Sequence, residues 1–598
     1  MSSGYWFVAP YEHVFRPAPL PAWVGPHIYD STGDLVWSGA SMFQGSDSYD
    51  FRMSDFGEEK LMTFAYRDDC AAVFMDTNYK VKKEGRFARD LGDLNMHDLN
   101  VIENGTRALV LTKQGGIATE QMSKDVGLEK DLCHAAFDGF KVMDTTKDQW
   151  EPVFEWSTFD HIPLWESTYT NREIESRCST GWDYLHLNSV DKCPDGNYLL
   201  SARHSDTIYN INGTDGSIIW RLGGKLMDFQ QNFRFSRQHD IRCRAQDIEA
   251  GTYTISFLDN AKGHDSNDAT NEYSRGLIVD LDTRARPMTA RVQHEYAHPE
   301  KGFATSRGNL EVMENGNVFV GWAKQLLQSE YTAEGKLVME AKLVPEFLGT
   351  YRAYKFPFQG DPSQPPDVHS EVFSNPGAGP EKLTTHVYVS WNGATNVDEW
   401  RVYRSDSSAA HRELIGTAKR TSFETLITVE GYVSYIVVEA FDSWDHGMWH
   451  GKSGVVMTVR PADWASTSEA MGIETPEISK ARKKGSWVAT PVATFLAGFA
   501  SMGLLLLVAW YLSRAVKKST LLSKWRRRRG LMDYLPLAES EKEAEARDTT
   551  PSIVLRNRER SESKLESATS VAPLPLHKSM HRRGDSIQRT GRPMPLTP

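Results

Sequence analysis

One local pattern repeats along residues 1–350 of the chain. Short runs of β-branched and aromatic residues alternate with Asp-Gly, Asn-Gly or Thr-Gly pairs, as in "LNSVDKCPDGNYLLSARH" from Leu187 and "GNLEVMENGNVFVGWA" from Gly308. These pairs supply the turns of tight β-hairpins. Two kinds of hairpin recur, and together they make a four-stranded unit every ~45–60 residues, the spacing of β-propeller blades. We therefore expect an all-β fold in which residues 1–355 form a six-bladed β-propeller closed into a ring.

The start of the chain bears on how complete that ring is. The first residues, "MSSGYWFVAP", have neither a charged n-region nor an apolar segment long enough for a signal peptide. The repeat also begins within what would be the first blade. We expect this blade to be truncated and the natural N-terminus to lie upstream. A solenoid is the less favoured fold, because its repeats would be shorter and more uniform.

The segment 381–461 has a different pattern. Its first half, "HVYVSWNGATNVDEWRVYRS", alternates polar and apolar residues. This alternation puts three apolar residues on one face of a strand: Val387, Val389 and Trp391. Short antiparallel strands over about eighty residues predict a small β-sandwich of the fibronectin-III or immunoglobulin type. The Pro- and Gly-rich stretch 356–380 is interpreted as a linker, and 462–484 as a second one.

The segment 485–513 predicts a membrane anchor. It contains no charged side chain and is rich in Val, Leu, Phe, Ala and Gly. A helix of about 20 apolar residues crosses a bilayer core, so we expect a single transmembrane helix here. More Lys and Arg follow the segment than precede it, with the densest cluster at Arg526 to Arg529. The positive-inside rule then predicts a lumenal or extracellular propeller and a basic, then disordered, cytoplasmic tail over 514–598.

Charge and cysteine content exclude several classes of function. The net charge of −11 argues against a nucleic-acid partner. The five cysteines show no Cys-x-x-Cys pair and no metal-ligand spacing, and no aspartate spacing matches a calcium loop, so we expect no metal and no cofactor. All five lie before residue 250, which allows one or two disulfides in an oxidising compartment, with the pairing left open. Two sequons, at Asn104 and Asn212, fit a secreted glycoprotein.

Polar residues recur at the starts of the predicted hairpins. His97 opens one hairpin, His186 and Asn188 open the next, which ends at Arg203, and His239 opens a third. The innermost strand of a propeller blade starts at the central channel, so we expect these side chains to converge on one axial site. Imidazoles and a guanidinium gathered there would form a cationic pocket for an oxyanion such as sulfate.

This set of residues suits group transfer through histidine. A neutral imidazole can attack sulfur to give a sulfo-histidine, which an acceptor hydroxyl later discharges. The guanidinium and imidazoles would stabilise charge on the equatorial oxygens of the transferring group. A second histidine can protonate the leaving phenolate or deprotonate the incoming phenol.

Other residues of the same hairpins are given structural roles. Arg203 alternatively forms a buried salt bridge with an aspartate such as Asp183. His204 follows Arg203 directly, so strand alternation predicts that its side chain faces the opposite way. Tryptophans that recur at strand ends are interpreted as packing residues between blades: Trp37, Trp156 and Trp220.

The stretch "DYLHLNSVDKCPDGNYLLSARHSDTIYNINGTDGSIIWRLGGK", followed by "FSRQHD", resembles the signature of the arylsulfotransferase family, in its fungal branch. The likeness covers roughly residues 5–350 and continues into the sandwich and the anchor. It implies a six-bladed propeller that moves a sulfuryl group from a phenolic sulfate ester to another phenol without a nucleotide donor. Matched by motif, it implies His239 as the nucleophile. The residues that it implies to bind and polarise the sulfuryl group are His97, His186, Asn188 and Arg203.

Two other functions compete with the enzymatic one. The sandwich and the anchor also suit a non-catalytic cell-surface propeller that binds an anionic ligand or a protein partner, since fold alone does not determine function. A degenerate, structural family member is the third alternative, because the first blade is expected to be truncated. Bacterial relatives lack the sandwich and the helix. In the enzymatic case we expect a small phenolic or aryl sulfate substrate, and the sequence specifies neither donor, acceptor nor oligomeric state.

Overall fold

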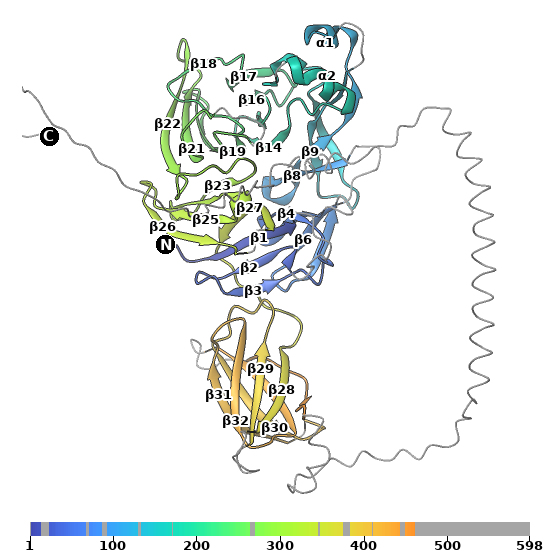
Figure 1. The fold of residues 1–598 in the computed structure, drawn as a ribbon, viewed down its shortest axis with the longest axis vertical. Helices are drawn as coiled ribbons and strands as arrows, with labels where there is room; N and C mark the ends of the chain where they lie inside the picture. The colour runs from blue at the N-terminus through green and yellow to red at the C-terminus, as the bar shows by residue number, and fades with distance from the viewer. Residues whose placement is uncertain are drawn as a thin grey trace, which may run out of the picture. The chain divides into compact units, whose positions relative to one another are not determined.

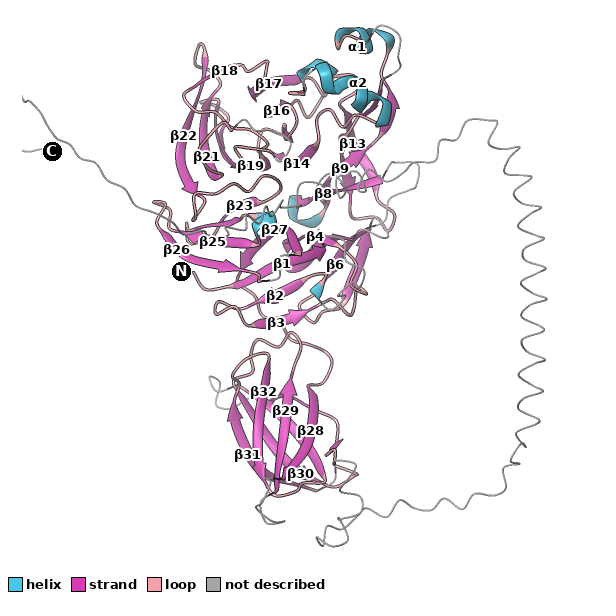
Figure 2. Cartoon of the chain, in the orientation of Figure 1, coloured by secondary structure: helices cyan, strands magenta, loops and turns pink. Residues whose placement is uncertain are grey.

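The computed structural model describes residues 2–12, 23–66, 71–85, 93–128, 133–169, 171–263, 269–344, 347–374, 383–409, 411–442 and 449–460. Within these ranges the fold is nearly all β, with two short α-helices, α1 (Glu120–Asp125) and α2 (Asn171–Thr180) (Figure 2). No helix in these ranges is long and apolar enough to cross a membrane. The predicted transmembrane helix 485–513, the linker 462–484 and the tail 514–598 lie outside the described residues.

The described part of residues 5–356 contains six sheets of four or five strands and one two-stranded sheet (Figure 1). In hydrogen-bonded order, the first two four-stranded sheets are β27 (Leu348–Phe356), β1 (Tyr5–Glu12), β2 (His27–Tyr29), β3 (Leu35–Ser38), and β4 (Ser48–Phe56), β5 (Glu59–Tyr66), β6 (Ala71–Met75), β7 (Val81–Gly85). The next two are β8 (Asp93–Ile102), β9 (Arg107–Lys113), β12 (Gly139–Asp144), β13 (Glu151–Ser157), and β14 (Leu187–Lys192), β15 (Tyr198–Ala202), β16 (Thr207–Ile211), β17 (Ile218–Gly223). The fifth is β23 (Asn309–Val312), β24 (Val318–Gly321), β25 (Leu327–Tyr331), β26 (Leu337–Lys342). The five-stranded sheet is β19 (His239–Asp247), β20 (Thr252–Asp259), β21 (Arg275–Asp282), β22 (Met288–Ala297), β18 (Phe229–Gln231), and the two-stranded one pairs β10 (Gly115–Ile117) with β11 (His134–Ala136).

The two ends of this region pair with each other. β27 lies antiparallel to β1, with Tyr5 opposite Phe356 and Pro10 opposite Thr350. The strands that begin the six sheets contact one another in a closed order: β27, β4, β8, β14, β19, β23 and back to β27. This arrangement is consistent with a propeller-like β fold. The expectation of a truncated first sheet is wrong, because β27, from the far end of the region, supplies the fourth strand of the sheet that contains β1.

Local turn chemistry and aromatic packing explain the sheets. Between β14 and β15, Gly196 has φ +86°, a left-handed conformation that glycine adopts without steric cost. The three tryptophans predicted to pack between sheets are 5% exposed or less, which confirms that prediction: Trp37, Trp156 and Trp220. Trp220, for example, lies 5.8 Å from the ring of Tyr253, which belongs to the next sheet.

Two disulfides link segments of this region. Cys193 at the end of β14 is bonded to Cys243 in β19, so this bridge joins two neighbouring sheets. Cys133 is bonded to Cys178 in α2. The prediction of one or two disulfides is therefore confirmed, and Cys70 lies outside the described residues.

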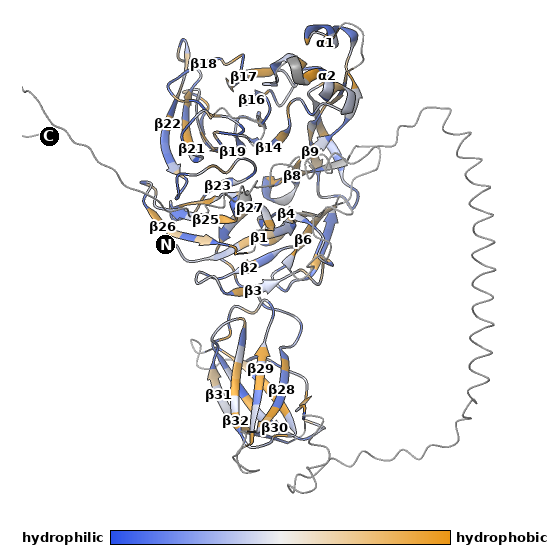
Figure 3. Ribbon diagram, in the orientation of Figure 1, coloured by the Kyte–Doolittle hydropathy of each residue, from blue (hydrophilic) through white to orange (hydrophobic). Residues whose placement is uncertain are grey.

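Residues 367–457 form two further sheets. One contains β28 (Asp367–Ser374), β29 (Leu383–Ser390) and β32 (Glu424–Glu430). The other contains β31 (Arg412–Lys419), β30 (Glu399–Ser405), β33 (Tyr435–Phe441) and β34 (Trp449–Lys452), with β35 (Val456–Met457) paired to β33. Both sheets contribute apolar residues to one core cluster, as in a β-sandwich. Polar and apolar residues alternate along β29 (Figure 3), and the three residues predicted to share a face are buried.

The sandwich begins earlier than predicted. β28 lies within 356–380, which the sequence analysis assigned to a linker. The prolines and glycines of that stretch concealed a short run, "DVHSEVFS", that pairs along its whole length with β29. Backbone pairing with a neighbouring strand, rather than local composition, therefore decides the structure of this run.

Candidate active site

The first strands of three sheets place the candidate histidines. His97 lies in β8, His186 directly precedes β14, and His239 is the first residue of β19. All three side chains are buried, and the rings of His97 and His186 are 4.8 Å apart, edge to face. His97 Nδ1 makes a short hydrogen bond with the amide oxygen of Asn95. The structure thus brings together residues that are far apart in sequence.

His239 is held through both ring nitrogens. Nδ1 lies 2.9 Å from the carbonyl oxygen of Arg237 and 2.7 Å from Oδ1 of Asn260, so it donates and carries the proton. The Asn260 amide cannot be turned round, because its nitrogen donates to two carbonyl oxygens, those of Ala304 and Arg307. Nε2 accepts the backbone N–H of Arg307 at 3.1 Å. The lone pair of a neutral imidazole is therefore on Nε2.

The electrostatic surroundings keep His239 neutral. Burial, together with the charge of Arg203, holds the pKa of His239 well below its ordinary value, and the hydrogen bond with Asn260 opposes this only in part. The two residues whose backbone contacts the ring, Arg237 and Arg307, have φ of 56° and 63°. Side chains other than glycine rarely adopt this left-handed region, so the backbone around His239 is strained to hold the ring.

Arg203 and His204 act as a pair. The Nη1 group of Arg203 lies 2.7 Å from Nε2 of His204, and Nη2 donates to the Thr305 carbonyl oxygen at 3.5 Å. Burial and the charges of His186 and Arg203 hold the pKa of His204 well below its ordinary value. The prediction that His204 faces away from Arg203 is wrong. β15 ends at Ala202, so both residues lie in a turn where strand alternation does not apply.

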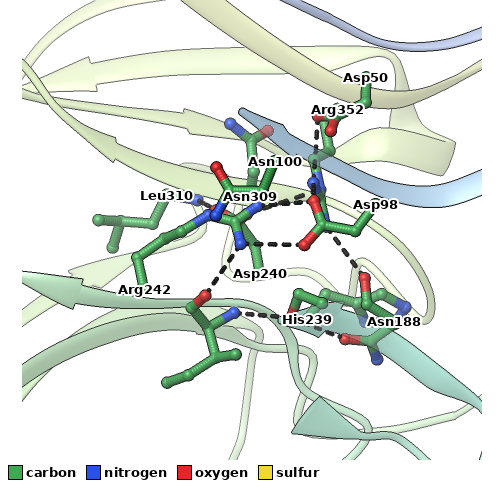
Figure 4. A network of polar contacts seen from close by, with 12 residues as sticks. Asp50, Asp98, Asn100, Asn188, His239, Asp240, Arg242, Asn309, Leu310 and Arg352 are labelled. Atoms are coloured by element: carbon green, nitrogen blue, oxygen red, sulfur yellow. Dashed lines mark hydrogen bonds and ion pairs between the residues drawn. The ribbon is translucent and has the colours of Figure 1, made fainter. Parts of the chain in front are cut away.

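Asn188 contacts the backbone before the candidate nucleophile. Its Nδ2 group donates to the carbonyl oxygen of Gln238 at 2.7 Å, and the Asn188 side chain is fully buried. Its own carbonyl oxygen accepts a hydrogen bond from Arg352 at 3.0 Å (Figure 4). Asn188 therefore joins β14 to the start of β19.

A buried network of charges lies beside Asn188 and His239 (Figure 4). Asp98 Oδ1 is 2.6 Å from Nη1 of Arg352 and 2.9 Å from Nη2 of Arg242. Arg352 also pairs with Asp50 at 3.1 Å, and Arg242 with Asp240 at 2.8 Å. Although burial alone would raise it, the two guanidinium groups hold the pKa of Asp98 well below its ordinary value. The network cross-links β4, β8, β19 and β27.

Most residues of this network are not among the predicted site residues. Asp98 and Asp240 directly follow His97 and His239, so a recurring His-Asp pair was visible as a signal. Arg352 left no such signal, because its strand, β27, comes to the site only through pairing with β1 at the other end of the region.

Three side chains could approach a metal ion. The ligand atoms of Asp183, His186 and His204 all lie within 4.8 Å of one another. The Asp183 carboxylate, however, lies 2.7 Å from His186 Nδ1, and the guanidinium of Arg203 lies 2.7 Å from His204 Nε2. A fixed positive charge at one ligand atom opposes a cation. The cluster therefore suits a hydrogen-bonded chain beside an anion better than a metal centre.

One family model matches part of the chain. Residues 92–343, less than half of the 598 residues, match the family model described as Arylsulfotransferase (ASST). The match includes every candidate site residue named above except Asp50 and Arg352. It supports an arylsulfotransferase family and, at that level, transfer of a sulfur-containing group with an aryl substrate. No curated protein matches the chain with significance.

Several solved structures show weak similarity to this chain. A protein of unknown function from Bacteroides caccae is 10% identical, with a TM-score of 0.34, and the match covers 59% of this chain and 98% of that chain. Hydrazine synthase of Kuenenia stuttgartiensis is 9% identical, with a TM-score of 0.28, over 55% of this chain and 86% of that chain. AztD of Citrobacter koseri is 8% identical, with a TM-score of 0.26, over 60% of this chain and 99% of that chain. Similarity at this level carries no information about activity.

Proposed function

We propose that this chain is a nucleotide-independent aryl sulfotransferase that moves a sulfuryl group from an aryl sulfate ester to a phenolic acceptor through a sulfo-histidine on His239. One observation carries the proposal: His239 is a buried, neutral imidazole with its proton on Nδ1 and its lone pair on Nε2, within the field of Arg203. Such an imidazole is a nucleophile at neutral pH, and it lies where the family match and the motif coincide.

The first half-reaction uses the lone pair of His239. Nε2 attacks the sulfur of the donor, the bond between sulfur and the phenolic oxygen breaks, and the phenolate leaves. Before substrate binds, the backbone N–H of Arg307 donates to Nε2. This hydrogen bond has to break as sulfur approaches, because both use the same lone pair. The Nδ1–H stays bonded to Arg237 and Asn260, which stabilises the positive charge that develops on the ring.

The second half-reaction returns the enzyme to its starting state. The oxygen of the acceptor phenol attacks the sulfur of sulfo-histidine, the bond between nitrogen and sulfur breaks, and the phenol loses its proton to a nearby base. In this scheme Arg203, His97 and His186 stabilise the charged sulfuryl oxygens, and the two histidines exchange protons with the phenols. Asn188 holds the carbonyl oxygen of Gln238 and thereby the backbone from which His239 projects.

The proposal extends to the architecture and the location. The six sheets would be the six blades of a propeller, and the pairing of β27 with β1 would close the ring. Residues 485–513 would anchor the chain as a single-pass membrane protein, with the propeller lumenal or extracellular and the tail cytoplasmic. The two disulfides support an oxidising compartment for the propeller.

The test is transfer by the purified full-length protein, given 4-nitrophenyl sulfate and phenol without a nucleotide donor. We expect phenol-dependent release of nitrophenolate. His239→Ala should lower it at least about 1,000-fold, because removal of a nucleophile abolishes the covalent route. His369→Ala is the matched control, since this histidine is exposed on β28. Mass spectrometry of the protein quenched without acceptor should find the sulfuryl group on the peptide that contains His239. A folded wild type that releases no nitrophenolate from several donors would rule out the proposal.

A non-catalytic propeller that binds an anion is the second candidate. The observation that favours it is the hydrogen bond from the Arg307 N–H, which occupies the lone pair that a nucleophile needs. If this candidate is correct, calorimetry should show that wild type binds sulfate and aryl sulfates and that Arg203→Ala binds them more weakly. Neither wild type nor the variant should turn over an aryl sulfate.

A further inference from the structure

Asp183 holds His186 with both of its carboxylate oxygens. Oδ2 lies 2.7 Å from Nδ1 of the ring, and Oδ1 accepts the backbone N–H of His186 at 2.9 Å. His186 has φ of 52°, a left-handed conformation that few residues other than glycine adopt. A carboxylate that binds both the ring and the backbone can maintain such a conformation. The pairing also fixes which ring nitrogen faces the acid: Nδ1 donates to Asp183, and Nε2 is the other site of protonation.

A second carboxyl group, that of Asp138, is also buried. Asp138, in the loop between β11 and β12, is 2% exposed, and among the described residues its Oδ1 atom has no hydrogen-bond partner. The backbone N–H of Leu187, the residue after His186, donates to the Asp138 carboxyl group. Burial and the negative charge of Asp183 raise the pKa of Asp138 to about 7. The charge of His186 and its hydrogen bond outweigh burial at Asp183 and hold the pKa of that group well below its ordinary value. The two carboxyl groups are thus driven to opposite protonation states.

We propose that Asp183 is a positioning residue that holds His186 as the proton donor to the leaving phenolate. The proposal rests on the sulfotransferase function argued above and assigns roles that neither the motif series nor the family match gives. A carboxylate that accepts from both the ring and the backbone of a histidine fixes the tautomer and the orientation of that ring.

The proton balance closes over one cycle. In the first half-reaction the doubly protonated His186 gives the proton on Nε2 to the departing phenolate, so a neutral phenol leaves. His186 then keeps the Nδ1–H that bonds to Asp183. In the second half-reaction the acceptor phenol gives its proton to Nε2 as its oxygen attacks sulfur. His186 regains its charge, Asp183 stays ionised, and no other reagent is consumed.

Charged and titratable groups face this pair from several elements. They are His97 on β8, Lys113 on β9, Asp138 before β12, Tyr184 before β14, and His204, Arg203 and Arg237 in the turns beside it. The positive charges of Lys113 and the arginines favour the ionised form of the carboxylates. His97 and His204 lie beside His186 with their imidazole rings in contact with its ring. A pH profile of the wild type alone would therefore combine several groups, and the test has to compare variants.

The experiment compares two donors on the full-length protein. 4-Nitrophenolate leaves readily without a proton, whereas the phenolate from phenyl sulfate needs one. We expect Asp183→Asn to lower transfer from phenyl sulfate about 100-fold but transfer from 4-nitrophenyl sulfate only a few-fold, the range of general acid catalysis. Asp183→Glu, which keeps the charge, should restore part of the loss. Asp148→Asn, an exposed aspartate, is the matched control. Equal losses with both donors, or no loss, would overturn the proposal.

Three further measurements separate the alternatives. Asp138→Asn should remove one ionisation near neutral pH from the rate profile with phenyl sulfate. This variant leaves the contact between Asp183 and His186 in place, so it can be measured even if Asp183→Asn does not fold. Carbethoxylation of His186 by diethyl pyrocarbonate, followed by peptide mapping, should reach its midpoint at a lower pH in Asp183→Asn than in wild type. This readout needs no turnover, so it tests the pair even if the wild type is inactive and the sulfotransferase proposal fails. An unchanged midpoint, or activity that a chelator abolishes and a divalent cation restores, would overturn the pairing.

Discussion

The buried carboxyl group of Asp138 should make the stability of the protein depend on pH in a direction opposite to that of most carboxylates. In the folded protein Asp138 keeps its proton up to a pKa of about 7, whereas its ordinary value is 3.8. Between these pH values the folded state binds more protons at this group than the unfolded state. Raising the pH through this window therefore lowers the free energy of unfolding. Asp138→Asn removes this dependence, because an amide does not titrate.

The size of the effect follows from the shift. One pKa unit corresponds to 1.36 kcal/mol, so a shift of about three units sets a ceiling of about 4 kcal/mol between pH 4 and pH 8. The side chain is almost fully buried, so solvent does not screen it strongly. At pH 4 the variant should show only the cost of the substitution itself. By pH 8 its free energy of unfolding, relative to that of wild type, should have risen by up to that ceiling.

The assay is urea unfolding of wild type and Asp138→Asn at half-unit steps from pH 4 to pH 8, with the difference in free energy plotted against pH. The buried histidines His204 and His239, whose pKa values are held well below the ordinary value, also make stability depend on pH, but they are present in both proteins and their contributions cancel. Exposed Asp148→Asn should give a flat difference. A flat difference for Asp138→Asn as well would refute the reasoning, because the group would then not retain its proton in the folded state.

Three other perturbations test the framework around the site. Arg352→Met should lower the free energy of unfolding by at least about 3 kcal/mol, measured by urea unfolding, because it leaves buried carboxylates without their cation; a loss below about 1 kcal/mol would contradict this. Gly308→Ala should destabilise the protein and weaken transfer, because Gly308 has φ +96° and a Cβ atom there would lie 2.6 Å from the Gly321 carbonyl oxygen. A melting temperature and an activity equal to those of wild type would count against this. Peptide mapping without reduction should recover Cys193 linked to Cys243, and reduction should cost about 2–5 kcal/mol of stability; separate free thiols would show that the bridge does not form.

The repeating strands could be predicted because their signals are local. A glycine such as Gly196 sets its own turn, whatever surrounds it, and alternation along β29 marks its buried face directly. His186, directly before β14, and His239, at the start of β19, could be found for a related reason. A repeated fold puts equivalent positions of successive repeats near one axis, so recurrence along the sequence predicts proximity in space.

Other features depend on which segments meet, and no local pattern encodes that. β28 was missed because pairing with β29 outweighs its prolines and glycines. His204 was given the wrong orientation because the end of β15 depends on its partner strands. The number of strands in the first sheet was misjudged because the strand that completes it comes from residues 348–356.

By itself the sequence determined the all-β repeat, the sandwich pattern and three histidines that recur in successive hairpins, because each depends on neighbouring residues or on a fixed period. Only the tertiary structure decided the protonation of the site. Whether a carboxyl group keeps its proton depends on burial and on the charges beside it, and those neighbours come from distant strands. Asp138 and Asp183 are 45 residues apart in the chain and have opposite pKa shifts because the fold places them together.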